Sequence, residues 1–462
     1  MSPTELAYQG GVHTPLCEEH TAEALPVRGQ LPSGLRGTFA RNSGAPRFAP
    51  RGRYHWFDGD GMVHAVRLGE GRASYRNRWV RTRGLERELG EGRAIWPGIL
   101  EPPDPTLPGG PLKDTANTDL VWWNERLLAL WWLSGTPYEL RLPELETVGP
   151  VDFQGTLRGR VAAHAKPCPT SGELVFFDYS VSRPPWYQYG VVGADGRVRV
   201  YTPIETAGPR IPHDIAITPT RTVLLDLPLG WDPQQLRRGK FRIAFDRAAP
   251  SRFGVLPRHG DGSQVRWFEL EACYVYHTVA AWDDGDAVVV VGCAIDDPIP
   301  DAPRPGVPHL DTIQLAPRLT RWRFDLASGR ATRELLDERL TEFPRARDDR
   351  LGLPTRFAYH PRVAPADELL FAGLIKYRLD DGTSVARDWP RGWFGGEVVF
   401  APDPAGSAED DGWLLTILSS ADAPRSELWV LDARDPAREP LARVELPARV
   451  PPGFHAAWCP GA

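Results

Sequence analysis

The chain has 462 residues and a net charge of -6, and it contains no block of lysines and arginines, which argues against nucleic acid as an electrostatic partner. Its 47 prolines and 45 glycines disfavour long helices, because proline removes a backbone donor and glycine costs helix entropy. With 42% hydrophobic residues available for a core, the composition predicts an all-β fold with many turns.

The cysteines and the first residues bear on the cellular compartment. Five cysteines form no Cys-x-x-Cys pair, and their odd number favours reduced, buried thiols over a disulfide framework. Residues 1–10 carry Glu5 and no apolar stretch, and no run of 18 apolar residues occurs. We therefore expect a cytoplasmic protein, soluble or at most in peripheral contact with a membrane.

Short β-rich runs recur along the chain between turn signals. The runs are residues 174–179, 223–227, 287–292, 369–374, 413–418 and 427–432. Turns such as Ser171-Gly172 and Asp283-Asp284-Gly285 bound most of them and are typical of hairpins. No crisp repeat is visible, but propeller blades tolerate large insertions on one face. Seven blades would average roughly 66 residues each.

Three long segments rich in proline or arginine are predicted to lie outside the sheets as loops. They are residues 96–112, 228–259 and 296–318, and one short helix is expected over residues 234–240. Long loops in a compact domain usually form lids or walls of a functional site. No change of composition marks a boundary, so residues 1–462 are predicted to form a single domain.

Four histidines stand in apolar segments that resemble strands or border turns. They are His164, His213, His277 and His455, separated by 49, 64 and 178 residues. No pair has the spacing that places two metal ligands on one helical turn. A metal bound by all four would need a fold that returns four separate segments to one point.

Several common catalytic and ligand-binding motifs are absent or incomplete in this sequence. Residues 90–95 lack the third glycine of a dinucleotide fingerprint, and neither a phosphate-binding GxxxxGK[ST] loop nor a GxSxG elbow occurs. Asp58-Gly59-Asp60-Gly61 has no downstream bidentate glutamate and reads as a turn rather than a calcium loop.

Five segments carry a family resemblance that covers nearly the whole chain. They are residues 37–42 (GTFARN), 54–65 (YHWFDGDGMVHA), 252–258 (RFGVLPR), 342–345 (EFPR) and 452–455 (PGFH). In this order they resemble the carotenoid cleavage oxygenase family. The resemblance implies a seven-bladed β-propeller, in which a dome of long loops and short helices covers an axial metal site. It further implies an Fe2+ ion held by His164, His213, His277 and His455.

The resemblance also implies carboxylates that orient the histidines from behind. Glu342 and Glu397 are the matching residues, and we expect them to accept the distal N–H groups of His277 and His455. A third family glutamate should follow Trp131, where this chain has Trp132. An indole donates and cannot accept, so His213 would need a carbonyl, a water or another acid as its partner.

The activity implied by the resemblance is the cleavage of a C=C double bond of a carotenoid or apocarotenoid by an Fe2+ dioxygenase. The partners are then an apolar small molecule and O2, and the products are two carbonyl compounds. No further cofactor is needed. Trp131, Trp132 and Tyr138 are candidate walls of a substrate tunnel, although a core role is equally compatible with each.

Two alternatives remain open at this stage. A second branch of the family cleaves stilbenes and related phenylpropenes, and it resembles a pattern with Lys-Glu where this chain has Trp131-Trp132. Without that lysine a phenol-ionising mechanism loses its base, which favours a polyene substrate. The other alternative is a non-catalytic propeller, suggested by the missing glutamate and opposed by the four retained histidines.

Overall fold

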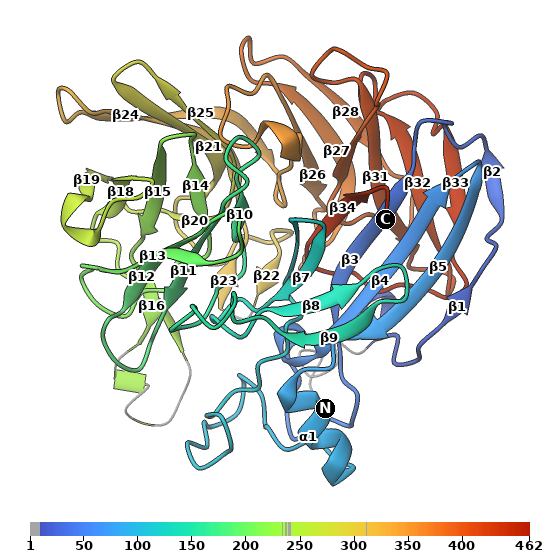
Figure 1. Ribbon diagram of the computed structural model, residues 1–462, viewed down its shortest axis with the longest axis horizontal. Coiled ribbons are helices and arrows are strands. Elements are labelled where there is room, and N and C mark those ends of the chain that lie inside the picture. Colours follow the sequence, from blue (N-terminus) through green and yellow to red (C-terminus); the bar gives the residue numbers. More distant parts are fainter. Residues whose placement is uncertain (1–9, 233, 236–237, 239–241, 311) are drawn as a thin grey trace. The chain divides into compact units, whose positions relative to one another are not determined.

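The computed structural model describes residues 10–232, 234–235, 238, 242–310 and 312–462 (Figure 1). The chain divides into two compact units. Unit 1 comprises Met1–Val151, Asp232–Arg242 and Arg387–Ala462, and unit 2 comprises Asp152–Trp231 and Ile243–Ala386. Each unit is built from antiparallel sheets, and the single domain predicted for residues 1–462 stays a prediction.

Unit 1 contains three sheets within the described residues. The first runs in the order β1 (Thr21–Ala22), β5 (Arg72–Trp79), β4 (Asp60–Gly69), β3 (Gly37–Ala45), β34 (Ala456–Pro460). The second is β6 (Asp119–Trp123), β7 (Arg126–Leu130), β8 (Tyr138–Arg141), β9 (Glu146–Pro150). The third is β2 (Val27–Gly29), β33 (Ala442–Glu445), β32 (Ser426–Asp432), β31 (Gly412–Ser420), β29 (Trp393–Phe394), with β30 (Val399–Pro402) also paired to β31.

Among its described residues, unit 2 contributes four larger sheets. In order they are β10 (Lys166–Pro167), β11 (Leu174–Tyr179), β12 (Tyr187–Val192), β13 (Val198–Ile204); then β14 (Ile215–Ile217), β15 (Arg221–Asp226), β18 (Ser251–Pro257), β19 (Arg266–Leu270). The next two are β20 (Tyr274–Asp284), β21 (Ala287–Ile295), β24 (Arg318–Asp325), β25 (Ala331–Leu340); and β26 (Phe357–Val363), β27 (Phe371–Arg378), β28 (Ser384–Asp388). Two small ribbons pair β16 (Leu229–Trp231) with β17 (Ile243–Phe245), and β22 (His309–Leu310) with β23 (Ile313–Gln314).

Helices are few and short in the described part of the chain. The α-helix α1 (Arg83–Glu91) begins after Thr82, whose side chain accepts the N–H of Leu85, and ends at Gly92 in the left-handed conformation. Single 3-10 turns occupy Gly11–His13, Trp56–Asp58, Gly262–Gln264 and Asp348–Arg350. This distribution agrees with the high proline and glycine content.

Each of the six β-rich runs overlaps a strand, and the all-β prediction is confirmed. The prediction for residues 228–259 was partly wrong, because this segment contains β18, which pairs with both β15 and β19. The arginines of the segment obscured a short apolar run in which Phe253, Val255 and Leu256 are buried. The helix predicted over 234–240 falls mostly on residues outside the described set.

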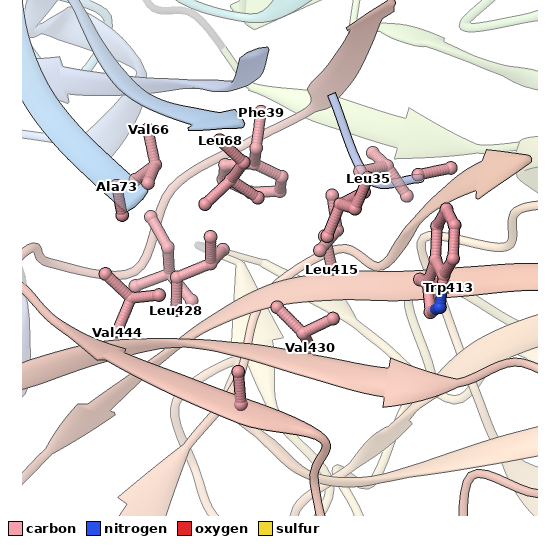
Figure 2. Close-up of a cluster of buried hydrophobic side chains, with 14 of the residues drawn as sticks. Leu35, Phe39, Val66, Leu68, Ala73, Trp413, Leu415, Leu428, Val430 and Val444 are labelled. Carbon is pink, nitrogen blue, oxygen red and sulfur yellow. The ribbon is translucent and has the colours of Figure 1, made fainter. Parts of the chain in front are cut away.

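The core of unit 1 shows how these sheets are stabilised. Residues of β3, β4 and β5 pack against residues of β31, β32 and β33 in one hydrophobic cluster. Figure 2 shows Phe39, Val66 and Leu68 facing Leu415 and Leu428. All five of these side chains are at most 2% exposed, so each contributes the free energy of nearly complete removal from water.

This packing predicts a large difference between two leucine truncations. Leu428→Ala should lower the free energy of unfolding by about 3 kcal/mol, because it leaves a cavity in the cluster. Leu335→Ala is the matched control, since Leu335 is 44% exposed, and it should change stability by less than about 0.5 kcal/mol. Urea unfolding followed by tryptophan fluorescence measures both, and equal midpoint shifts would contradict the assigned core.

Candidate metal centre

Unit 2 brings three of the four predicted ligand residues together. The ligand atoms of His164, His213 and His277 all lie within 4.8 Å of one another. Their ring centroids are 4.8 Å apart for His164 and His213, 4.8 Å for His164 and His277, and 5.0 Å for His213 and His277. All three side chains are buried. The cluster offers three imidazole nitrogen donors, a set that suits iron, zinc, copper or nickel.

The backbone near these histidines is irregular in ways that aim their side chains. His164 precedes β10 and has a φ of 67°, a left-handed conformation that is uncommon outside glycine. His277 lies inside β20 where the pairing with β21 shifts register between Val275 and Thr278. A β-bulge redirects a side chain out of the regular alternation, and bulges recur next to functional sites.

Asp214 connects the three chain segments that carry these histidines. Its Oδ2 accepts the N–H of Thr278 at 2.7 Å and the hydroxyl of Thr278 at 2.8 Å. Its Oδ1 pairs with Nζ of Lys166 at 2.7 Å. Lys166 follows His164 by two residues, Asp214 follows His213 by one and Thr278 follows His277 by one, so a single buried carboxylate fixes all three segments.

Glu342 lies against His277 from the end of β25. Its Oε2 is 2.5 Å from Nδ1 of His277, and it also accepts the N–H of Phe343. Because Nδ1 faces the carboxylate, Nε2 is the nitrogen of His277 that remains for a metal. A carboxylate in this position fixes the tautomer and orientation of the ring and makes it a stronger donor.

Unit 1 holds the fourth predicted ligand in a similar arrangement. Nδ1 of His455 is 3.0 Å from Oε1 of Glu397, whose Oε2 accepts the N–H of Ala456 at 2.5 Å. Both His455 and Glu397 are buried. The N–H of His455 also donates to the carbonyl of Thr118 at 3.2 Å, which ties the histidine to the start of β6.

The residues around His455 explain the Pro-Gly-Phe-His motif. A Cβ at Gly453 would lie 2.5 Å from the carbonyl oxygen of Asn42, so only glycine fits there. The ring of Phe454 stacks on Trp56 at 4.3 Å. Arg41 donates to the carbonyl of Pro451 at 2.6 Å. Burial lowers the pKa of Arg41 to about 10, and the charge of Glu397 opposes this shift.

Trp132 occupies the place where the resemblance implied a glutamate. It is buried in unit 1, its N–H donates to Oγ1 of Thr118 at 3.2 Å, and its ring lies 5.3 Å from that of Phe57. In unit 2 the ring of His213 is 4.8 Å from Tyr276 in an edge arrangement. The structure therefore places the ring of Tyr276 beside His213.

Asp119 is a residue that the sequence did not single out. It begins β6, it is 5% exposed, and a carboxylate oxygen lies within 4.8 Å of a ring nitrogen of His455. Its local signal was weak, because an aspartate after Asn117-Thr118 also reads as an ordinary turn residue at the start of a strand.

A small pocket of about 50 Å³ in unit 1 is lined on one side by Trp131 and Trp132. Its polar side includes Lys113, whose Nζ pairs with Asp60 at 2.8 Å and Glu88 at 2.6 Å. The indole N–H of Trp131 has no hydrogen-bond partner among the described residues. The third candidate wall residue, Tyr138, instead packs in a core cluster, and its tunnel role stays a prediction.

Known proteins are similar to this chain in sequence and in structure. The sequence model of the family described as RPE65, retinal pigment epithelial membrane protein, matches residues 13–460. The carotenoid cleavage oxygenase of Mycobacterium tuberculosis is 37% identical, with 98% of this chain and 97% of the relative covered. The crystal structure of the Pseudomonas brassicacearum lignostilbene dioxygenase has a TM-score of 0.88 at 29% identity, covering 98% of each chain. The structure of a variant of the Synechocystis apocarotenoid oxygenase has a TM-score of 0.83 at 27% identity, covering 99% of this chain and 98% of its own.

The chain belongs to the RPE65 and carotenoid cleavage oxygenase family. Its fold class is the seven-bladed β-propeller predicted from the sequence, with three of the larger sheets in unit 1 and four in unit 2. The family resemblance stated from five short segments is therefore confirmed.

The carboxylates behind the histidines give one prediction. Glu342→Gln and Glu397→Gln should each weaken metal binding roughly tenfold or more, because an amide keeps the size of the side chain but loses its charge. Competition against a chelator measures the affinity for Fe2+ under anaerobic conditions. The control is Glu139→Gln. Glu139 lies on β8 and its carboxylate pairs with Arg126 of β7, so this variant should bind metal like the native protein. Equal affinities for all four proteins would contradict the assignment.

A second prediction concerns Asp58 in the pocket. Burial raises the pKa of Asp58 to about 7, although hydrogen bonds from the N–H groups of Ile99 and His55 lower it in part. A carboxyl whose folded pKa exceeds its usual 3.8 contributes stability at low pH that is lost as pH rises through about 7. Asp58→Asn cannot ionise, so its urea midpoint relative to the native protein should rise between pH 4.5 and pH 7.5.

The control for this prediction is Asp104→Asn. Hydrogen bonds from Thr106 lower the pKa of Asp104, so its replacement should give no such rise. If the difference in urea midpoint between Asp58→Asn and the native protein is constant across this pH range, Asp58 is ionised throughout.

Proposed function

We propose that this protein is an Fe2+-dependent dioxygenase that cleaves one C=C double bond of a carotenoid or apocarotenoid to two carbonyl products. The observation that carries the proposal is the buried cluster of His164, His213 and His277, with Glu342 behind it, in a chain of the carotenoid cleavage oxygenase family. The reaction balances without a reductant, because one double bond and one O2 become two C=O groups.

The residues present fit an iron ion. His164, His213 and His277 are close together and buried, and we propose His455, held by Glu397, as the fourth ligand. Several metals suit imidazole nitrogen, and membership of this family favours Fe2+ among them. When bound, the ion would supply the redox chemistry that activates O2.

The protein's own residues orient the histidine rings and the substrate, and they exclude water from the site. Glu342 and Glu397 accept the Nδ1–H groups of His277 and His455, which keeps Nε2 of each ring available as a donor. Positional specificity then depends on how the apolar substrate is held, because the reacting double bond must lie beside the ion. Trp131 and Trp132 are the wall residues proposed for this role.

A carotenoid or apocarotenoid substrate is supported by two of the relatives, whose names specify carotenoid or apocarotenoid oxygenases. It is also supported by Trp131 and Trp132, since an apolar wall suits a polyene better than a charged pair would.

We propose a cytoplasmic location, with at most peripheral contact with a membrane from which an apolar substrate could be drawn. Five free cysteines, four of them buried, are consistent with a reducing compartment. Among the described residues no helix is both long and apolar enough to cross a membrane.

A second candidate function is the cleavage of hydroxystilbenes. The similar structure from Pseudomonas brassicacearum is a lignostilbene dioxygenase, and the pocket beside Trp131 also presents Tyr54 and Asp58. A carboxyl with a pKa of about 7 could accept the proton of a phenol, which Trp131 cannot do.

Metal content and product analysis test the proposal together. Iron-loaded protein should hold about one Fe2+ per chain and convert an apocarotenal to two aldehydes identified by mass spectrometry. His277→Ala should retain under about a tenth of the iron and of the product, because the site loses a ligand that Glu342 orients. Full iron in His277→Ala would overturn the ligand assignment.

The substrate panel separates the alternatives. Carotenes, apocarotenals and hydroxystilbenes are offered to the same preparation, with Leu335→Ala as a surface control. Faster turnover of a hydroxystilbene than of every apocarotenoid would favour the second candidate. Iron-loaded protein that cleaves none of them would favour the non-catalytic propeller.

A further inference from the structure

Arg41 is a buried cation beside the segment that carries His455. Its side chain is 1% exposed, and its Nη2 donates to the carbonyl of Pro451 at 2.6 Å. Its Nε has no hydrogen-bond partner among the described residues. Burial lowers the pKa of Arg41 only to about 10, so the side chain stays charged at neutral pH, and the charge of Glu397 opposes the shift. A buried cation and a buried carboxylate thus stabilise each other in unit 1.

Two glycines leave the space that this guanidinium occupies. A Cβ at Gly396 would lie 2.9 Å from Nη1 of Arg41, and a Cβ at Gly453 would lie 2.8 Å from its Nε. Gly396 directly precedes Glu397, and Gly453 precedes His455 by two residues. At Gly396 the three atoms nearest to such a Cβ all belong to Arg41, and the backbone there is not left-handed. The side chain of Arg41, rather than a turn, therefore accounts for this glycine.

Arg41 lies close to the backbone of both segments that form the pair of His455 and Glu397. In that pair Oε1 of Glu397 is 3.0 Å from Nδ1 of His455, and Oε2 accepts the N–H of Ala456 at 2.5 Å. Removing one partner of a buried charge pair is costly, and the cost falls when the remaining charge moves toward water. Loss of Arg41 would therefore displace Glu397 and weaken its hold on the ring of His455.

We infer that Arg41 is a positioning residue of the metal centre, which holds Glu397 against His455 and acts on a bound ion only through that pair. The inference rests on the proposed function, because it requires an ion at His455. It also gives Gly396 a role, which is to leave room for the guanidinium next to Glu397. All the residues that carry it belong to unit 1.

The first test replaces Arg41 in the full-length protein. Arg41→Gln should lower the Fe2+ affinity measured by chelator competition at least about tenfold, as is typical of residues that orient a metal ligand. Arg41→Lys keeps the charge and should bind Fe2+ within about threefold of the native protein. With Co2+ as the probe, the visible absorption spectrum should change in Arg41→Gln, because a ligand ring changes its orientation. Arg67→Gln, at an exposed position of β4, is the control and should change neither measurement.

The second test moves the guanidinium without changing any charge. Gly396→Ala adds a methyl group that meets Arg41, so the arginine must shift. The Fe2+ affinity should fall at least about threefold, and the same substitution should have little further effect in Arg41→Gln, where the shorter side chain leaves the space free. Gly69→Ala is the matched control, since a Cβ there meets no atom within 4 Å. Gly396→Ala also decides the question if Arg41→Gln does not fold.

The route through Glu397 is tested by combining two substitutions. In Glu397→Gln, adding Arg41→Gln should lower the Fe2+ affinity less than about twofold, because the carboxylate through which Arg41 acts is already lost. If the two effects multiply instead, Arg41 acts independently of Glu397 and the inference is overturned. A merely structural role predicts that Arg41→Gln and Arg41→Lys lower the urea midpoint alike, with the affinity and the Co2+ spectrum of the folded protein unchanged. That result would also overturn it.

His455→Ala is measured alongside, to separate this inference from the proposed function. If His455→Ala binds Fe2+ like the native protein, the proposed metal centre fails, and the role of Arg41 fails with it. If His455→Ala loses iron while Arg41→Gln and Gly396→Ala keep the native affinity, only the role of Arg41 fails.

Discussion

The buried carboxylate of Asp214 is the constraint on which the histidine cluster of unit 2 depends. It bonds to Thr278 and Lys166, so it connects the neighbours of three histidines that lie 49 and 64 residues apart in the sequence. Fixing three separate segments costs chain entropy, and charge-assisted hydrogen bonds in a buried setting are strong enough to offset part of that cost. The irregular backbone of His164 and the bulge at His277 persist because the segments on which they lie are held in this way.

In unit 1, main-chain hydrogen bonds fix the segment that carries His455. β34 adds to β3 immediately after His455, with Arg41 opposite Ala456, and the carbonyl of Thr118 accepts the N–H of His455. Glu397 then bonds to both the His455 ring and the Ala456 N–H. The histidine is thus fixed at its backbone and at its ring, and little rotational freedom is left for an ion to remove on binding.

The sequence predicted the parts of this protein that have a local signature. Strands such as β11 and β21 follow from apolar runs between turn residues, and His455 was recognisable because it ends the Pro-Gly-Phe-His motif. His164, His213 and His277 were recognised from the apolar segments in which they stand and from the family resemblance. β18 was not predicted because Arg252 and Gly254 interrupt its apolar pattern. Asp214 and Asp119 could not be predicted because the residues near them in space lie far away in the sequence. A single aspartate after a histidine or a threonine belongs to no periodic pattern that would indicate such contacts.

Trp131 and Trp132, just after β7, line the pocket of unit 1 at the position where the sequence resemblance implied a glutamate. Both side chains are buried, and they give this part of the pocket an apolar surface. A glutamate beside a lipid-like substrate would carry a desolvation cost, and the two tryptophans avoid it. An aromatic wall of this kind therefore suits the polyene substrate that we propose better than a charged side chain would.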